Sequence, residues 1–152
     1  MTSAIHHTVI VVGDLEESLR FYRDGIGLDV LQDRQVDGDW PALFEATTRS
    51  LRVVFLGTAG VADIHAGVLE LNSFEGDVPT GQASSPPRTG LFMLSYFVDV
   101  EATLARLAAL GLGGTPRRVS QPIPGGEIAI ATVQDPDGVT ILLTPGSITQ
   151  HS

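Results

Sequence analysis

Two stretches of the chain share one order of apolar and polar positions. The first stretch begins with the apolar run 9–12 and reaches Asp14. Apolar residues then recur at helical spacing, as Leu15, Leu19 and Tyr22. An apolar run that meets a capping Asp and changes to helical periodicity is typical of a strand that leads into a helix. We therefore expect a strand and then a helix near the start of the chain.

The second stretch repeats this order 85 positions later, when Asp99 is aligned with Asp14. The apolar run 92–98 precedes Asp99, and apolar residues again follow at helical spacing. Those residues are Val100, Leu104 and Leu107. An internal repeat of this kind indicates that one structural unit is built twice.

Three further segments with strand character follow each expected helix, which predicts two tandem βαβββ modules and an α+β fold. The segments are 28–36, 51–56 and 67–72, and then 117–121, 127–134 and 139–144. We expect a single domain over residues 1–152, with module one at 4–73, a Gly- and Pro-rich linker at 74–90 and module two at 91–146. The DPDG motif at 135–138 predicts a tight turn between the last two strands.

Composition narrows the chemistry that the chain can perform. The absence of cysteine excludes disulfides and thiolate metal sites, which leaves His, Asp and Glu as the strong metal ligands. A net charge of −9 disfavours nucleic acid and anionic membrane surfaces as partners. The apolar runs are too short for a membrane span, and no signal-like segment opens the chain, so a cytoplasmic location is expected.

The paired modules, the segment DLEESLRFYRDGIGL and the DPDG hairpin together resemble the vicinal oxygen chelate superfamily. This group includes glyoxalase I, extradiol dioxygenases and bleomycin-resistance proteins. The resemblance implies modules that curl into an incomplete barrel around a cavity. It also implies a divalent metal in the enzyme members, held by residues of the first and last strands of each module, and a homodimer.

The resemblance places His7 and Glu70 at the two ligand positions of module one. The corresponding positions of module two hold Phe92, seven residues before Asp99, and Leu142. A catalytic metal generally needs three protein ligands, so we expect no resident metal and no other cofactor, with His7 and Glu70 as fallback ligands.

The three remaining histidines are poorly placed to repair such a site. His6 should point away from His7, because side chains alternate along a strand. His65 falls in a predicted hairpin connection and His151 in the C-terminal tail.

Strand alternation predicts a largely aliphatic and aromatic cavity, which suits a hydrophobic or aromatic small molecule. Trp40, Leu43 and Phe44, between the second and third strands, are added as a ligand-facing segment. Trp40 and Phe92 could instead belong to the core, and His7 could pair with Glu70 for structure alone. The predicted lining is His7, Val9, Val11, Trp40, Leu43, Phe44, Glu70, Asn72, Phe92, Leu94, Tyr96, Thr140 and Leu142.

These features favour a self-resistance protein that sequesters a hydrophobic polycyclic antibiotic, such as an enediyne, without catalytic residues. The alternative is a vicinal oxygen chelate enzyme, an isomerase, lyase or dioxygenase, in which His7 and Glu70 serve as acid and base. A metal-independent tailoring enzyme of natural-product biosynthesis is a third possibility.

Overall fold

The structure is a computed structural model that describes residues 3–64 and 67–146. The chain divides into two compact units: the residues up to Arg23 with Gly27–Thr80, and Asp24–Ile26 with the residues from Gly81 onward. We call them unit one and unit two. Each contains one mixed sheet of four strands, and neither sheet closes into a barrel. Within the described ranges, no helix has the length and apolar character needed to cross a membrane.

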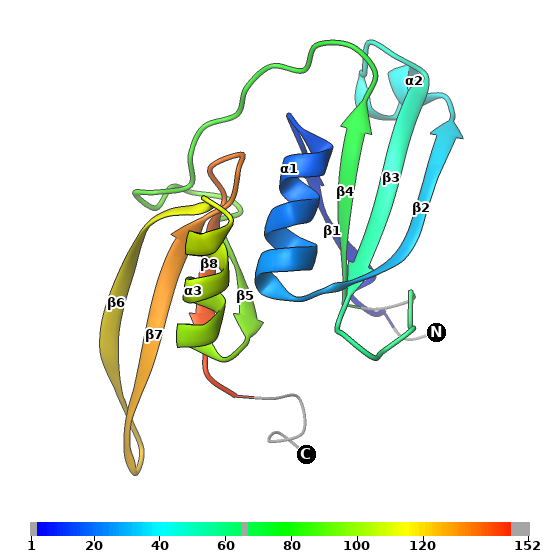
Figure 1. The fold of residues 1–152 in the computed structure, drawn as a ribbon. Coiled ribbons are helices and arrows are strands. Elements are labelled where there is room, and N and C mark those ends of the chain that lie inside the picture. The colour runs from blue at the N-terminus through cyan, green and yellow to red at the C-terminus, as the bar shows by residue number, and fades with distance from the viewer. Residues whose placement is uncertain (1–2, 65–66, 147–152) are drawn as a thin grey trace. The chain divides into compact units, whose positions relative to one another are not determined.

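The sheet of unit one has the strand order β1-β4-β3-β2 (Figure 1). Strand β1 runs parallel to β4, and the other neighbours are antiparallel. Helix α1 continues directly into a π-helical segment, η1. The elements are β1 His7–Val11, α1 Leu15–Leu19, η1 Arg20–Ile26, β2 Asp29–Asp37, α2 Trp40–Phe44, β3 Ser50–Gly57 and β4 Val68–Phe74, with Asp24–Ile26 of η1 assigned to unit two.

The sheet of unit two repeats this topology with the order β5-β8-β7-β6. Strand β5 is parallel to β8, as β1 is to β4. The elements are β5 Met93–Phe97, α3 Val100–Ala109, β6 Gly113–Ile123, β7 Gly126–Gln134 and β8 Thr140–Thr144. The prediction of an α+β fold with two βαβββ units is confirmed.

The predicted capping residues begin both helices. The Oδ1 atom of Asp14 accepts a hydrogen bond from the backbone N–H of Glu17 at 3.1 Å, and Asp99 does the same with Ala102 at 3.0 Å. These bonds satisfy backbone donors that the first turn of a helix leaves unpaired. The helical segment of unit one ends at Gly27, whose φ of 96° suits a residue without a side chain.

One face of each sheet is covered by its helix (Figure 1). In unit one the covered face contributes a nearly solvent-free apolar core, and α1 adds Leu15 and Leu19 to it. In each unit, the opposite face, which the unit's helix does not cover, is called the open face below. The core side chains of the unit-one strands are Ile10, Val54, Leu56, Leu69 and Leu71.

The connections between the second and third strands differ between the two units. In unit one, residues 38–49 separate β2 from β3 and include α2. In unit two, only residues 124–125 separate β6 from β7. The extra segment gives unit one a helix at one end of its sheet, for which unit two has no counterpart.

The DPDG motif forms the predicted turn between β7 and β8. The Oδ1 atom of Asp135 accepts hydrogen bonds from the backbone N–H groups of Asp137 and Val139, at 2.9 and 2.8 Å. Ser84, from the predicted linker, binds to the same hairpin: its Oγ atom accepts from the backbone N–H of Thr140 at 2.6 Å. The linker is thus anchored to unit two at this point.

Candidate functional site

His7 and Glu70 meet on the open face of unit one. In the parallel pairing of β1 with β4, His7 lies opposite Val68 and Val9 lies opposite Glu70, which places both functional side chains on the same face. The Nε2 atom of His7 is 3.2 Å from the Oε2 atom of Glu70. Glu70 is buried, with 8% of its surface exposed, while the His7 side chain retains access to solvent.

His6 lies against His7, so the expectation that it points away is wrong. Strand β1 begins at His7, and the alternation of side chains therefore does not extend to His6. The Nδ1 atoms of the two rings are 2.8 Å apart, and the Nε2 atom of His6 is 3.0 Å from the carbonyl oxygen of Ile64.

These two contacts define a hydrogen-bond chain that orients His7. The Ile64 carbonyl can only accept, so Nε2 of His6 is the donor. A neutral His6 then presents an unprotonated Nδ1, which accepts from Nδ1–H of His7. The Nε2 atom of His7 is thereby left to face Glu70. The His7 ring is thus held through its Nδ1 atom. A hydrogen bond at one ring nitrogen is a common way to orient an imidazole whose other nitrogen takes part in catalysis.

Phe55 lies beside His6 and His7, and the sequence did not predict it as a site residue. It lies opposite Glu70 in the pairing of β3 with β4. Its ring centroid is 6.0 Å from that of His7 and 6.4 Å from that of His6. Its position within a predicted strand was available from the sequence, but the pairing that puts it beside Glu70 was not.

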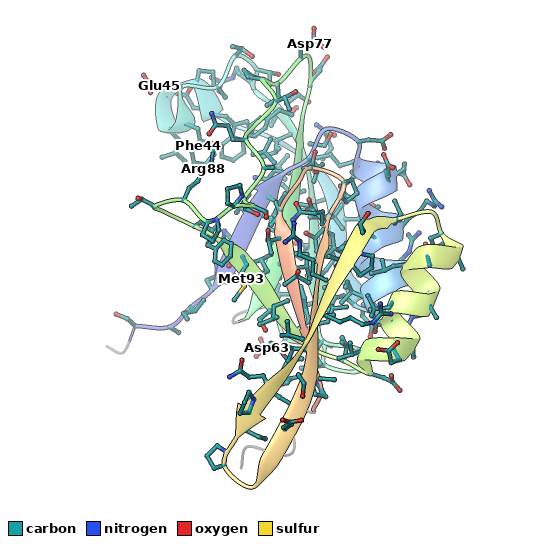
Figure 2. The ribbon with its side chains drawn as sticks, turned by 90° about the vertical axis from the view of Figure 1, so that its left-hand side faces the viewer. Phe44, Glu45, Asp63, Asp77, Arg88 and Met93 are labelled. Carbon is teal, nitrogen blue, oxygen red and sulfur yellow. The ribbon has the colours of Figure 1, made fainter. Side chains whose placement is uncertain are left out.

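A cavity of about 500 Å³ opens in unit one along the open face. Val9, Val11 and Asn72 contribute from β1 and β4. His7 and Glu70 occupy neighbouring positions on the same face of these strands but are not themselves lining residues. Figure 2 shows Phe44 and Glu45 at α2 and Asp77 on the segment after β4. The remaining lining residues are Ala46, Thr47, Thr48, Phe74, Val78 and Pro79.

Four residues predicted to contact a ligand therefore line this cavity: Val9, Val11, Phe44 and Asn72. Trp40 lies behind the wall, with its ring stacked on Phe44 at a centroid distance of 5.6 Å. Its Nε1 atom donates to the carbonyl oxygen of Val36 at 3.4 Å. Leu43 is largely exposed and is not among the lining residues.

The alignment of His7 with Phe92 is wrong by one residue. The backbone N–H of Val12 donates to the carbonyl of Asn72 at 3.0 Å, and Val98 makes the same bond to Thr144 at 2.9 Å. Val12 therefore corresponds to Val98, which shifts the strand alignment to 86 positions. The structural counterpart of His7 is Met93, which Figure 2 shows on β5, and Gly13 has no counterpart in unit two.

This shift changes the face on which two predicted lining residues lie. Leu94 and Tyr96 are paired with Ile141 and Leu143, which are fully buried. A Cβ atom placed on Gly113 would contact both Val133, the neighbour of Ile141 in β7, and Leu107 of α3. These residues thus share the face that α3 covers, and the expectation that Leu94 and Tyr96 lie on the open face is wrong.

Burial raises the pKa of the Tyr96 phenol above its ordinary value, and the nearby Asp135 carboxylate raises it further.

On the open face of unit two, Met93 pairs with Thr140, and Leu142 lies two residues farther along β8. Leu142 is therefore the counterpart of Glu70, as the sequence alignment predicted. The Oγ1 atom of Thr140 is held by Ser84 at 2.7 Å and by Gln134 at 3.1 Å. Phe92 precedes β5.

The side chains at these positions do not fit a resident divalent metal. Met93 and Leu142 offer no nitrogen or oxygen donor where unit one has His7 and Glu70. Among residues 3–64 and 67–146, no group of three or more His, Cys, Asp or Glu is placed to hold an ion. His65 and His151 lie outside the described residues. A catalytic metal generally requires three protein ligands, and His7 with Glu70 supplies two.

Comparison with known proteins identifies relatives along most of the chain. The family described as Glyoxalase/Bleomycin resistance protein/Dioxygenase superfamily matches residues 4–143. The lactoylglutathione lyase-like protein terB of Aspergillus terreus is 42% identical over 146 residues, which cover 92% of this chain and 74% of that protein. A probable lactoylglutathione lyase of Vibrio cholerae is 31% identical, over 91% of this chain and 88% of that protein.

Solved structures agree with this assignment. A glyoxalase family protein of Bacillus cereus superposes with a TM-score of 0.71 over 96% of this chain and 97% of that chain, and at 19% identity it supports the fold alone. The trypanothione-dependent glyoxalase I of Leishmania major is 28% identical, with a TM-score of 0.62 over 95% of this chain and 87% of that chain.

These relatives overturn the leading functional interpretation of the sequence. The prediction of a protein that sequesters an antibiotic without chemistry is wrong, because the matched proteins are named lactoylglutathione lyases or, at 42% identity, a lactoylglutathione lyase-like protein. The predicted roles in antibiotic resistance and drug sequestration are wrong for the same reason. The findings favour the enzyme alternative, a lyase of the vicinal oxygen chelate type.

Proposed function

Because the chain belongs to the Glyoxalase/Bleomycin resistance protein/Dioxygenase superfamily, we propose that it is an isomerase or lyase that acts on a small carbonyl compound at the open face of unit one. The observation that carries the proposal is the 3.2 Å contact between Nε2 of His7 and Oε2 of Glu70 beside the cavity. The names of the relatives, lactoylglutathione lyases, support a lyase.

The two side chains can move a proton between neighbouring carbon atoms of an α-hydroxy carbonyl compound. Glu70, as the carboxylate, takes the carbon-bound proton next to the carbonyl. His7, as the imidazolium with protons on both Nδ1 and Nε2, gives the Nε2 proton to the carbonyl oxygen, which yields an enediol. The reverse transfers at the neighbouring positions form an isomer, and the step needs no oxidant or reductant. General acid and base groups placed within hydrogen-bond reach contribute about 10²–10⁴-fold to such steps.

His6 and Phe55 serve as positioning residues in this proposal. The contact between the two Nδ1 atoms holds the His7 ring so that Nε2 faces Glu70. The ring of Phe55 lies beside both imidazoles and restricts their movement. Without these contacts His7 could rotate away from Glu70, so their removal should lower turnover more than substrate binding.

We propose that the cavity binds a hydrophobic or aromatic small molecule, because most of its wall is apolar. Val9, Val11, Phe44 and Asn72 would contact it directly, and Trp40 would support Phe44 from behind. The site proposed here makes no use of the other predicted ligand contacts, which stay predictions, as does the homodimer. Those residues are Leu43, Phe92, Thr140 and Leu142.

Solvent exchange tests the proposal without knowledge of the natural substrate. The protein is incubated in D₂O with a panel of neutral α-hydroxy ketones, including 2-hydroxyacetophenone, and loss of the α-proton signal is followed by NMR. We expect exchange with wild type and its loss in Glu70→Gln. The matched control is Leu142→Gln, at the corresponding position of unit two, which should exchange at the wild-type rate. Absence of exchange across the panel, or equal rates in both variants, would overturn the proposal.

A further inference from the structure

The charge and hydrogen-bonding groups of the unit-one cavity define a substrate class. We infer that this cavity takes a neutral, mostly apolar molecule that donates a hydrogen bond to Asn72, and that it disfavours glutathione conjugates. The inference rests on the proposed function, because it assigns the cavity to the same site as His7 and Glu70. It separates this chain from relatives whose name refers to lactoylglutathione.

Asn72 is the first observation that points to a ligand. It lines the cavity, is only 6% exposed, and its Oδ1 atom has no hydrogen-bond partner among the described residues. Its neighbours across the sheet, Val11 and Val53, have no polar side-chain atom to offer. A buried acceptor without a partner is unfavourable, and a ligand hydroxyl or N–H group at this position would satisfy it.

The apolar walls are the second observation. Val9, Val11 and Phe44 face the cavity, together with Phe74 and Val78. Burying an ionised carboxylate against such walls without a cationic partner is strongly unfavourable. A ring system or an alkyl chain gains free energy in the same place, because it removes apolar surface from water.

The charged lining residues are the third observation. Glu45 and Asp77 are the only charged residues of the lining, and both are exposed carboxylates. Glutathione carries two carboxylates and one ammonium group at neutral pH, so its conjugates are anionic. They would approach two negative charges with no arginine in the cavity wall to offset them.

Arg34 is an arginine of unit one whose strand position shares the open face with the cavity. Val53 pairs with Asn72 on one side and with Arg34 on the other, which puts Arg34 in the same row of the open face. It lies two strands from Asn72, a backbone separation of roughly 10 Å, and does not line the cavity. By contrast, Arg49 and Arg52 already form ion pairs, with Asp39 and Asp33.

The tryptophan provides a binding signal that does not depend on turnover. Trp40 is the only Trp of the chain and stacks on Phe44 in the cavity wall. Its fluorescence should therefore respond when a molecule enters the cavity, and calorimetry can check the affinities. The probes are 2-hydroxyacetophenone, its methyl ether 2-methoxyacetophenone, and S-benzylglutathione.

We expect 2-hydroxyacetophenone to bind about tenfold more tightly than its methyl ether, because only the hydroxyl compound can donate to Asn72. Asn72→Leu, which keeps the branched shape of the side chain but removes the acceptor, should abolish this preference. Equal binding of the two ketones to wild type would overturn the inference, whether or not the variant folds. So would a preference that persists unchanged in a folded Asn72→Leu protein.

S-benzylglutathione should bind at least about tenfold more weakly than the hydroxy ketone. Replacing both Glu45→Gln and Asp77→Asn should strengthen its binding, while Arg34→Gln should leave it unchanged. Tight binding of the conjugate that is lost in Arg34→Gln would overturn the inference and identify an anion site instead.

The outcomes separate this inference from the proposed function. Preferential binding of the hydroxy ketone without proton exchange would defeat the proposed chemistry and leave the substrate class intact. Exchange that depends on Glu70, combined with tighter binding of the glutathione conjugate, would support the proposed chemistry and overturn the substrate class.

Discussion

The open face of unit one carries His7 and Glu70 where the open face of unit two carries Met93 and Leu142. The two units match in strand order, in the capping Asp of the helix and in the apolar core beneath it. The buried residues that pack each sheet against its helix are apolar in both units, whereas the open-face residues at these two positions differ in chemistry between the units.

The second difference is the wall of the cavity. Unit one joins β2 to β3 through α2, and this segment supplies Phe44 and Glu45 to the cavity. Unit two joins the corresponding strands by a turn at 124–125 that can contribute no such wall. The chemistry and the substrate binding that we propose therefore both lie in unit one, and the following variants test that proposal.

The largest expected effect is on turnover. His7→Ala should lower kcat/KM in the exchange reaction by about 10²–10⁴-fold, because it removes the group that donates to the carbonyl oxygen. Met93→Ala, at the corresponding position of unit two, should leave kcat/KM close to wild type. Similar losses in both variants, with folding intact by circular dichroism, would contradict the assignment of the site to unit one.

Truncation of a buried leucine should lower the free energy of unfolding by a similar amount in the cores of the two units. Leu71 and Leu143 are fully buried in corresponding strands, so Leu71→Ala and Leu143→Ala should each lower the free energy of unfolding by about 2–5 kcal/mol. Urea denaturation measures this loss. Leu91→Ala, at a residue that is 75% exposed, is the control and should change stability by less than about 0.5 kcal/mol. A small loss at only one of the two buried sites would show that the units are not equivalent in packing.

The free energy of unfolding should fall at alkaline pH because of Tyr96, a largely buried ionisable residue that unit one lacks at the corresponding strand position. Burial raises the pKa of Tyr96 above the ordinary 10.0, whereas its counterpart in unit one, Ile10, cannot ionise. The unfolded chain therefore loses this proton at lower pH than the folded chain, so the stabilisation is complete below pH 10 and declines as the pH rises above it.

Tyr96→Phe should make stability fall less steeply above about pH 10, as measured by urea denaturation across that range. Its stability relative to wild type should therefore improve with rising pH, whatever the difference at neutral pH. Parallel curves for the two proteins would show that Tyr96 is not held in its neutral form by burial.

The smallest effect concerns the helix caps. Asp14→Ala and Asp99→Ala should each cost about 0.5–2 kcal/mol, because each removes one side-chain acceptor from the first turn of its helix. The Asn variants, Asp14→Asn and Asp99→Asn, keep an acceptor and should retain most of the stability. Unequal costs for the two Ala variants would indicate that the repeated sequence does not act in the same way in both units.

The sequence by itself determined the repeated architecture of this protein. Apolar periodicity, the capping Asp14 and Asp99, and the DPDG turn predict the elements close to where they occur. These signals are local, because they depend on residues a few positions apart in the chain. The positions of His7 and Glu70 on one face also followed from the resemblance and strand alternation.

Only the tertiary structure decided the register of β5. Alignment through the helix caps selects Phe92, but Gly13 is an extra residue between strand and helix in unit one, and hydrogen bonds across the sheet select Met93. A slip of one residue moves every side chain of a strand to its other face, which is why Leu94 and Tyr96 were misplaced.

The structure also decided which residues surround the site. His6 meets His7 because the strand begins one residue later, and Phe55 reaches both because β3 pairs with β4. Asn72 is a buried acceptor without a partner because its neighbours on the adjacent strands are valines. Phe44 lines the cavity because α2 lies at the end of the sheet. Each of these contacts joins residues distant in the chain or depends on a strand boundary, and local periodicity contains no information about such pairings.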